Sequence, residues 1–316
     1  MNSFKNGAHA DGRKVGVLDL LARAATVPGL NAVDLNYPDH VDGLELKQLK
    51  TRLADLDLTL NGLAMRYYSE PGFKLGAFTN PDPALRRTAI DQTKRGIDAM
   101  LELGGSLMTL WMGQDGFDYS FQTDYAQLWD WTLAAMSEVA DHVPSAEISI
   151  EYKPNEPRSF SLMPDIGTTL LAIHQIDRKN VGVTIDFAHV LYADEMPAYA
   201  AALAGRSKKL FGVHLNDGYG KRDDGLMVGT VHPIQTIELL YVLESIGYER
   251  IIYFDTFPDV TGLDPVAECS ANIATVEAMR TVVKRLQSDN RLGAAIARQD
   301  AVASNSIIRK AIYGGE

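Results

Sequence analysis

The stretch AEISIEYK, residues 146–153, alternates like a buried strand and ends on two charged side chains. Side chains two positions apart in a strand point to the same side of the sheet. If Ile148 and Ile150 face a layer of helices, Glu151 and Lys153 face the opposite, inner side. A carboxylate and an ammonium at the inner end of a strand indicate either a structural ion pair or part of a functional site.

Further β-rich runs alternate with helical periodicity along the whole chain. They span residues 31–37, 58–66, 106–112, 181–189, 209–217 and 251–258. We predict an eighth strand near residues 3–10, because eight strand–helix units close into a (β/α)8 TIM barrel. An open doubly wound sheet is the weaker alternative, since no glycine-rich phosphate loop follows any strand. The α/β barrel domain is therefore predicted to span residues 1–285.

Residues 286–316 lie beyond the eighth unit and have a helical pattern. We predict a short C-terminal extension. It either packs on a neighbouring subunit of a homodimer or homotetramer, or it frays.

The composition excludes several classes of protein. The chain has 46% hydrophobic and 22% charged residues, which is typical of a globular domain with a full core. A net charge of −11 argues against a nucleic-acid-binding face, which would be basic. No apolar run reaches the length of a membrane span, and the single cysteine, Cys269, is consistent with a reducing compartment. We expect a cytoplasmic protein that binds neither nucleic acid nor membrane.

Four metal-ligating residue types lie at the ends of four consecutive predicted strands. Chemistry in such barrels gathers at the carboxyl ends of the strands, so these side chains should meet. They are Glu151, Asp186, His214 and Asp255. Three converging carboxylates would repel one another without a cation. Oxygen-rich coordination with one imidazole suits Mn²⁺, Mg²⁺ or Co²⁺ better than structural Zn²⁺.

A second, weaker set of ligand types lies beside the first. His189 follows Asp186 by three residues, and the acidic loop after the next strand contains Asp223 and Asp224. Asp186 would bridge two ions, with His189 and either Asp223 or Asp224 on the second. The alternative is that this acidic loop is an ordinary solvated turn.

Lys153 lies two residues from Glu151 in the same strand. A salt bridge between them is disfavoured if Glu151 binds a metal. The ammonium is then free to hydrogen-bond a substrate oxygen near the ion.

Several segments resemble the xylose isomerase family of (β/α)8 enzymes. EYKPNEPR (151–158) is similar to the fifth-strand motif of that family. WMGQDGFDY (111–119) and FKLGAFTNPDPALRRTAI (73–90) resemble two further segments. The likeness extends from about residue 30 to residue 285, and DFAH (186–189) resembles a carboxylate-x-x-His that bridges two metals.

The resemblance implies roles for individual residues. Glu151 would bind a metal and Lys153 would polarise the carbonyl of a sugar. Trp111 and Phe78 would form the apolar wall of the sugar site. A hydroxide beside Asp223 or Asp224 would move the hydroxyl proton.

The chain departs from the xylose isomerase pattern at three places. His214 replaces an Asp, as in the rhamnose isomerase and ketose epimerase branches, and Asn36 replaces the ring-opening His while Asp39 keeps its place. The loop around Gly225 is one residue short. An acyclic or differently opened sugar becomes a plausible substrate.

The favoured interpretation is a divalent-metal-dependent aldose–ketose isomerase that shifts a hydride between C1 and C2 of a small sugar. A ketose 3-epimerase of the same superfamily is the alternative, but it would use Glu where this chain has Asp255. A DNA-repair endonuclease would need more histidines and a basic surface. A non-catalytic sugar-binding module would not need Lys153 beside a metal.

Overall fold

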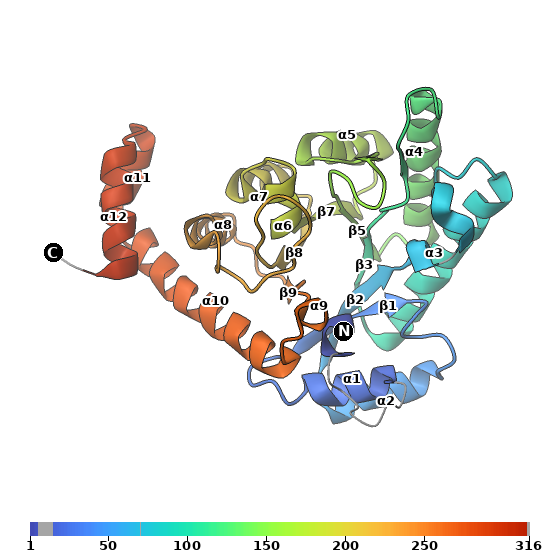
Figure 1. Ribbon diagram of the computed structural model, residues 1–316, viewed down its shortest axis with the longest axis horizontal. Helices are drawn as coiled ribbons and strands as arrows, with labels where there is room; N and C mark the ends of the chain where they lie inside the picture. The colour runs from blue at the N-terminus through green and yellow to red at the C-terminus, as the bar shows by residue number, and fades with distance from the viewer. Residues whose placement is uncertain (6–14, 70, 315–316) are drawn as a thin grey trace.

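The computed structural model describes residues 1–5, 15–69 and 71–314, and its main sheet is wound into a nearly closed barrel (Figure 1). Its seven strands follow the order β1-β2-β3-β5-β7-β8-β9, and all neighbours are parallel. They are β1 (Ala32–Tyr37), β2 (Thr59–Met65), β3 (Leu107–Leu110), β5 (Glu147–Glu151), β7 (Val181–Asp186), β8 (Leu210–Leu215) and β9 (Ile252–Phe254). The α/β TIM barrel predicted from the sequence is confirmed.

Most of the following helices form a ring around these strands (Figure 1). They are α1 (Val17–Ala24), α2 (Leu46–Asp55), α3 (Pro83–Leu103), α4 (Tyr125–His142), α5 (Ile166–Ile176), α6 (Phe187–Tyr192), α7 (Pro197–Arg206), α8 (Pro233–Ser245), α9 (Pro258–Thr261) and α10 (Pro265–Gln287). Asp82, Asp124 and Asp165 begin three of them by accepting a hydrogen bond from a first-turn amide. A two-stranded antiparallel sheet, β4 (Gly116–Phe117) with β6 (Phe160–Ser161), lies outside the main sheet. Two 3₁₀ turns, η2 (Tyr67–Ser69) and η3 (Pro71–Leu75), follow β2.

The predicted eighth strand is wrong for the residues that the structure describes. Asn2–Lys5 form a 3₁₀ helix, η1, and residues 6–10 lie outside the described residues. η1 contacts α1, α9 and α10, and the hydroxyl of Ser3 donates to the carbonyl of Thr256, just past β9, at 3.0 Å. The segment lacks the β-branched residues and apolar alternation that stabilise a strand, so a strand there had little local support.

The orientation predicted for β5 is confirmed. The hydroxyl of Ser149 lies 2.6 Å from that of Thr184 on β7, and Glu151 lines a cavity at the end of the barrel. Ser149 and Glu151 therefore share the inner side of β5. Ile148 and Ile150 point the other way and are buried in the apolar core.

The pairing of β7 with β8 contains a one-residue irregularity. Val183 pairs with Leu210, but Thr184 pairs with Gly212, so the register skips Phe211 and brings Asp186 opposite His214. A Cβ atom on Gly212 would lie 2.4 Å from the hydroxyl oxygen of Thr184, closer than real contacts allow. Glycine at this position thus permits the register that pairs two of the candidate ligands.

The C-terminal extension is helical and stands apart from the ring of helices (Figure 1). It consists of α11 (Asn290–Ala297) and α12 (Ala301–Tyr313), which pack on each other and on α10. No residue of α12 is fully buried, and Val302 and Tyr313 are 84% and 73% exposed. Among the described residues, no helix combines the length and the apolar character needed to cross a membrane.

Candidate metal centre

The four side chains predicted to hold a metal come together at the carboxyl ends of their strands. One ligand atom from each lies within 4.8 Å of the ligand atoms of the other three, and the four residues are Glu151, Asp186, His214 and Asp255. Among the described residues, only these four form such a group. Three of them line a cavity of about 370 Å³, and the fourth, Asp186, is completely buried beneath it.

The electrostatics of the group show why its donors suit a cation. Burial, together with the neighbouring carboxylates of Asp186 and Glu151, raises the pKa of Asp255 to about 7. Burial alone would lower the pKa of His214, but Glu151, whose Oε1 lies 3.2 Å from Nδ1, outweighs it and raises the pKa to about 10. Protons bound to Asp255 and His214 therefore reduce the repulsion among the carboxylates. A divalent ion in the same place would have this effect directly. The donor set fits such an ion.

Asn216 orients the most deeply buried of these carboxylates. Its amide nitrogen donates to both oxygens of Asp186, at 3.1 and 3.0 Å, and to the carbonyl of Asp255 at 3.0 Å. Its own oxygen accepts the amide hydrogen of Ala188. Asn216 was not predicted from the sequence, although it lies two residues after His214 and strand alternation could have placed it on the same side.

His189 lies beside the group but is held by hydrogen bonds. Its Nδ1 lies 3.1 Å from the carbonyl of Tyr152, and its Nε2 lies 3.0 Å from Oδ2 of Asp223. Burial opposes protonation, yet Asp186 and Asp223 raise the pKa of His189 to about 9. His189 and Asp223, two members of the predicted second metal set, therefore contact each other directly.

Lys153 contacts two carboxylates, and neither is Glu151. Its Nζ lies 3.1 Å from Oδ2 of Asp223 and 3.0 Å from Oε2 of Glu156. Burial alone would lower its pKa, but these carboxylates raise it above the usual value, so the ammonium stays charged. Nζ also lies 5.3 Å from the ring centroid of Trp111, which lines the cavity. Lys153 thus lies behind Trp111 and Asp223, which line the cavity.

The structure separates the remaining predicted residues into two groups. Asn36, Trp111 and Asp223 line the cavity with the metal group. Phe78, Asp39 and Asp224 do not. Phe78 is fully buried against Tyr67, with ring centroids 5.7 Å apart, and Asp39 is exposed beside Ser69.

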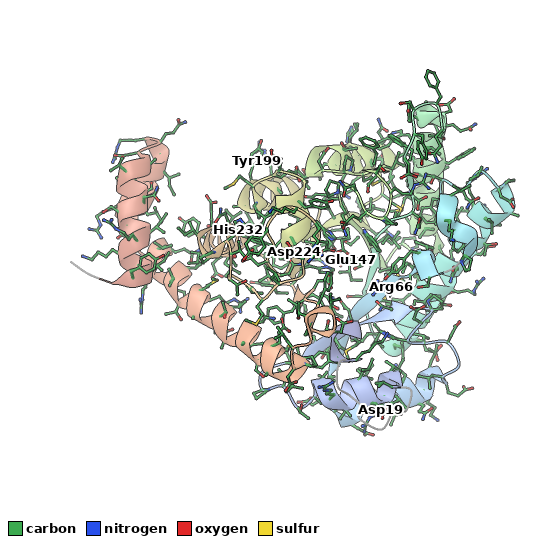
Figure 2. The ribbon with its side chains drawn as sticks, viewed as in Figure 1. Asp19, Arg66, Glu147, Tyr199, Asp224 and His232 are labelled. Carbon is green, nitrogen blue, oxygen red and sulfur yellow. The ribbon has the colours of Figure 1, made fainter. Side chains whose placement is uncertain are left out.

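Asp224 is the third residue outside the cavity. Its carboxylate accepts hydrogen bonds from the backbone amide of Tyr219 and the guanidinium of Arg222, within its own loop. Local hydrogen bonds to a turn therefore outcompete a contact with the metal group for this side chain. Figure 2 shows Asp224 on the β8 side of the barrel, and Arg66 on the side of β1 and β2.

A family model described as a xylose isomerase-like TIM barrel matches residues 21–282. The chain belongs to this family. The resemblance seen in the sequence is thereby confirmed over most of the barrel.

Two relatives within the family are xylose isomerases from Thermus species. That of Thermus thermophilus is 31% identical over 216 residues, which are 66% of this chain and 56% of that protein. The xylose isomerase of Thermus caldophilus is 29% identical over 216 residues, which are again 66% of this chain and 56% of that protein. The chain therefore spans a little over half the length of the curated relatives that it matches.

Solved structures with the same fold include two ketose epimerases. An L-ribulose 3-epimerase superposes with a TM-score of 0.69 at 19% identity, covering 86% of this chain and 92% of that one. A D-psicose 3-epimerase with D-tagatose, from Clostridium cellulolyticum H10, gives 0.66 at 16% identity, covering 85% and 94%. At such low identity these similarities support the fold.

Proposed function

We propose that this chain is a divalent-metal-dependent aldose–ketose isomerase acting on a small sugar or sugar derivative. The observation that carries the proposal is the position of Lys153, whose charged ammonium contacts Asp223 and lies 5.3 Å from the ring of Trp111, two residues that line the cavity together with Glu151. Similarity to xylose isomerases at the level of sequence supports the same class. The metal ligands proposed are Glu151, Asp186, His214 and Asp255, with Mn²⁺, Mg²⁺ or Co²⁺ as the ion.

The bound cation would act as a Lewis acid on the oxygens at C1 and C2 of the sugar. Lys153 would donate a hydrogen bond to the carbonyl oxygen as negative charge develops there. Trp111 would give the carbon atoms of the sugar an apolar surface, and the burial of the four ligand residues would keep water away from them. A hydride moving from C2 to C1, with the O2 proton passing to O1, converts the aldose into the ketose.

Asp223 would act on a hydroxyl group of the substrate, as Lys153 would act on its carbonyl oxygen. Its Oδ2 is occupied by His189 and Lys153, whereas its Oδ1 is buried without a hydrogen-bond partner among the described residues. We assign Oδ1 to the substrate hydroxyl that loses its proton. A second ion held by His189 and Asp223 stays a prediction, and it would have to displace the Lys153–Asp223 contact.

A ketose 3-epimerase is the second candidate, because two carboxylates of the group, Glu151 and Asp255, line the same cavity. Two such groups could remove and return a carbon-bound proton. Asp255 is one methylene shorter than the Glu expected for that reaction, and epimerisation has no need of Lys153. The isomerase therefore remains favoured.

Reaction in ²H₂O with Mn²⁺ separates the two candidates. An isomerase using a hydride shift interconverts aldose and ketose and leaves the migrating hydrogen unexchanged, as NMR of the product will show. A 3-epimerase instead inverts C3 and introduces deuterium there. Deuterium at C3 without aldose–ketose conversion would replace our proposal by the second candidate.

A further inference from the structure

Arg66, Tyr68 and Trp111 line one side of the cavity, and Lys153 lies behind Trp111, so that two cations and two aromatic rings form a row. Lys153 lies 5.3 Å from the ring of Trp111, whose centroid is 4.9 Å from that of Tyr68. The guanidinium of Arg66 lies 5.0 Å from the ring of Tyr68. The row begins at Lys153 beside Asp223 and ends at Arg66, just past the end of β2. Tyr68, Trp111 and Arg66 all line the cavity.

Arg66 is a cation whose partner is missing from the described part of the chain. No carboxylate among the described residues lies within 4.0 Å of its guanidinium, and its Nε is buried without a hydrogen-bond partner. A ring face attracts a guanidinium but accepts none of its in-plane hydrogen bonds. Buried polar groups in folded proteins are normally hydrogen-bonded. The in-plane donors of Arg66 are therefore available to a ligand in the cavity.

The charged residues around the cavity indicate which chemical group of a ligand would bind at Arg66. Arg66 is the only Lys or Arg among the described cavity-lining residues, whose carboxylates are those of Asp34, Glu151, Asp223, Asp255 and Asp259. In Figure 2, Arg66 lies on the side of β1 and β2, away from Asp224 on the side of β8. A guanidinium presents a planar fork that matches the two oxygens of a carboxylate or phosphate. A neutral sugar would leave this fork incompletely paired.

We propose that the substrate is an acidic sugar, one carrying a carboxylate or phosphate at the end remote from the reacting carbons, and that Arg66 binds this anionic group. The proposal rests on the isomerase function, because the sugar lies along the Tyr68–Trp111 wall with its carbonyl end toward Lys153. Arg66 is thus a specificity-determining residue that selects acidic over neutral sugars. A carboxylate and a phosphate both offer a pair of negatively charged oxygens to the guanidinium, and the experiment distinguishes these two groups.

Calorimetric titration of the Mn²⁺-loaded protein with three hexoses tests the proposal. Glucose, glucuronate and glucose 6-phosphate differ only at C6, and arabinose with arabinose 5-phosphate provides a pentose pair. At least one charged sugar should bind more tightly than its neutral counterpart. Replacing Arg66 by Gln should weaken that binding about 10- to 100-fold, as expected for a lost charge-assisted contact, and leave neutral sugars unaffected. Preference for glucuronate identifies a carboxylate, and preference for the phosphates identifies a phosphate.

Control variants separate this role from general effects. Arg280→Gln removes the same charge from the surface of α10, where Arg280 is 48% exposed, and should bind all sugars normally. Arg66→Lys keeps the charge and loses the fork, so it should bind the charged sugar with intermediate affinity. If Arg66→Gln does not fold, inorganic phosphate added to the wild type should weaken binding of the charged sugar and not of glucose.

Several results would overturn the inference: equal affinity for charged and neutral sugars, no binding of any, or an Arg66→Gln variant that weakens all alike. Turnover separates this outcome from failure of the proposed function. Isomerisation of neutral sugars, unchanged in Arg66→Gln, would refute the acidic substrate and keep the isomerase. Arg66-dependent binding of an acidic sugar without aldose–ketose conversion would support the acidic ligand and refute the isomerase.

Discussion

The ammonium of Lys153 lies 3.1 Å from the carboxylate of Asp223, although the two residues are 70 positions apart in the chain. The same carboxylate oxygen lies 3.0 Å from Nε2 of His189. The loop after β8 is therefore tied to two cationic groups from neighbouring units of the barrel. Glu151 therefore makes no ion pair with Lys153. Its closest ion-pair partner is His214, another of the four candidate metal ligands.

Replacing Lys153 by Met keeps the stem of the side chain and removes the donor. We expect turnover to fall about 10²- to 10³-fold, because the developing charge on the carbonyl oxygen loses one hydrogen bond. Metal content and melting temperature should change little, since Asp223 keeps its contact with His189. Steady-state kinetics with elemental analysis checks this. Normal turnover with an early melting transition would instead make Lys153 structural.

Removal of metal should abolish activity. Chelation leaves the carboxylates of the group to repel one another, so we also expect the melting temperature to fall and to recover when Mn²⁺, Co²⁺ or Mg²⁺ is added back. Calorimetry of the metal-free and reloaded protein measures this. Full activity in a sample shown by elemental analysis to be metal-free would contradict the mechanism.

Asn216→Ala should weaken metal binding without altering a ligand. Asp186 loses two hydrogen bonds that orient it, and residues of this kind typically change metal affinity by about 10- to 100-fold. Asn272→Ala is the matched control, because Asn272 is also buried and hydrogen-bonded, to Glu268 and Val228, but lies outside the metal group. Both variants should be destabilised by about 1–3 kcal/mol. Equal loss of metal affinity in both would argue against an orienting role.

Glu138 should make stability depend on pH in the acid range. Its hydrogen bonds to Arg87 and Lys94 lower its pKa from 4.5 to about 2. The folded state thus favours the ionised form, so this stabilisation is complete above pH 4.5 and is lost as pH falls toward 2. The carboxylate is 38% exposed, so Glu138→Gln should cost only about 0.5–1 kcal/mol at pH 7. Urea unfolding from pH 7 to pH 2 should show the two proteins converging; a constant difference would contradict the assignment.

We propose that α12 packs on a second copy of the chain, which is one of the two alternatives that the sequence left open. The exposed Val302 would then be buried in the oligomer, and Val302→Glu should lower the mass measured by light scattering. Tyr199, on the outer surface of α7, is 64% exposed and provides the control Tyr199→Glu (Figure 2). An unchanged mass for Val302→Glu would leave the extension as a free arm.

The metal group was predictable because its members depend on local pattern alone. Each of Glu151, Asp186, His214 and Asp255 lies within one residue of the end of a strand, and parallel strands bring their carboxyl ends to one face. The sequence also predicted that Lys153, two residues beyond the end of β5, lies on the same side as Glu151. These predictions required only periodicity and the order of the strands.

The loops were harder to predict because distant residues determine their conformations. Asp115 accepts hydrogen bonds from the amides of Ala77 and Thr79, which fixes the loop that contains Phe78 and turns it into the core. Such contacts between sequence-remote loops leave no periodic signal. Arg66 was missed for a related reason, because only the assembled cavity shows that its guanidinium is unpaired.

The skipped residue between β7 and β8 means that the identities of the four ligands do not by themselves define the centre. With uninterrupted pairing from Val183 and Leu210, Asp186 would stand opposite Val213. Because a one-residue slip reverses which side each residue of a strand faces, His214 would no longer accompany Asp186. Transplanting this centre into a designed scaffold therefore requires the irregular pairing and Gly212 as much as the ligands.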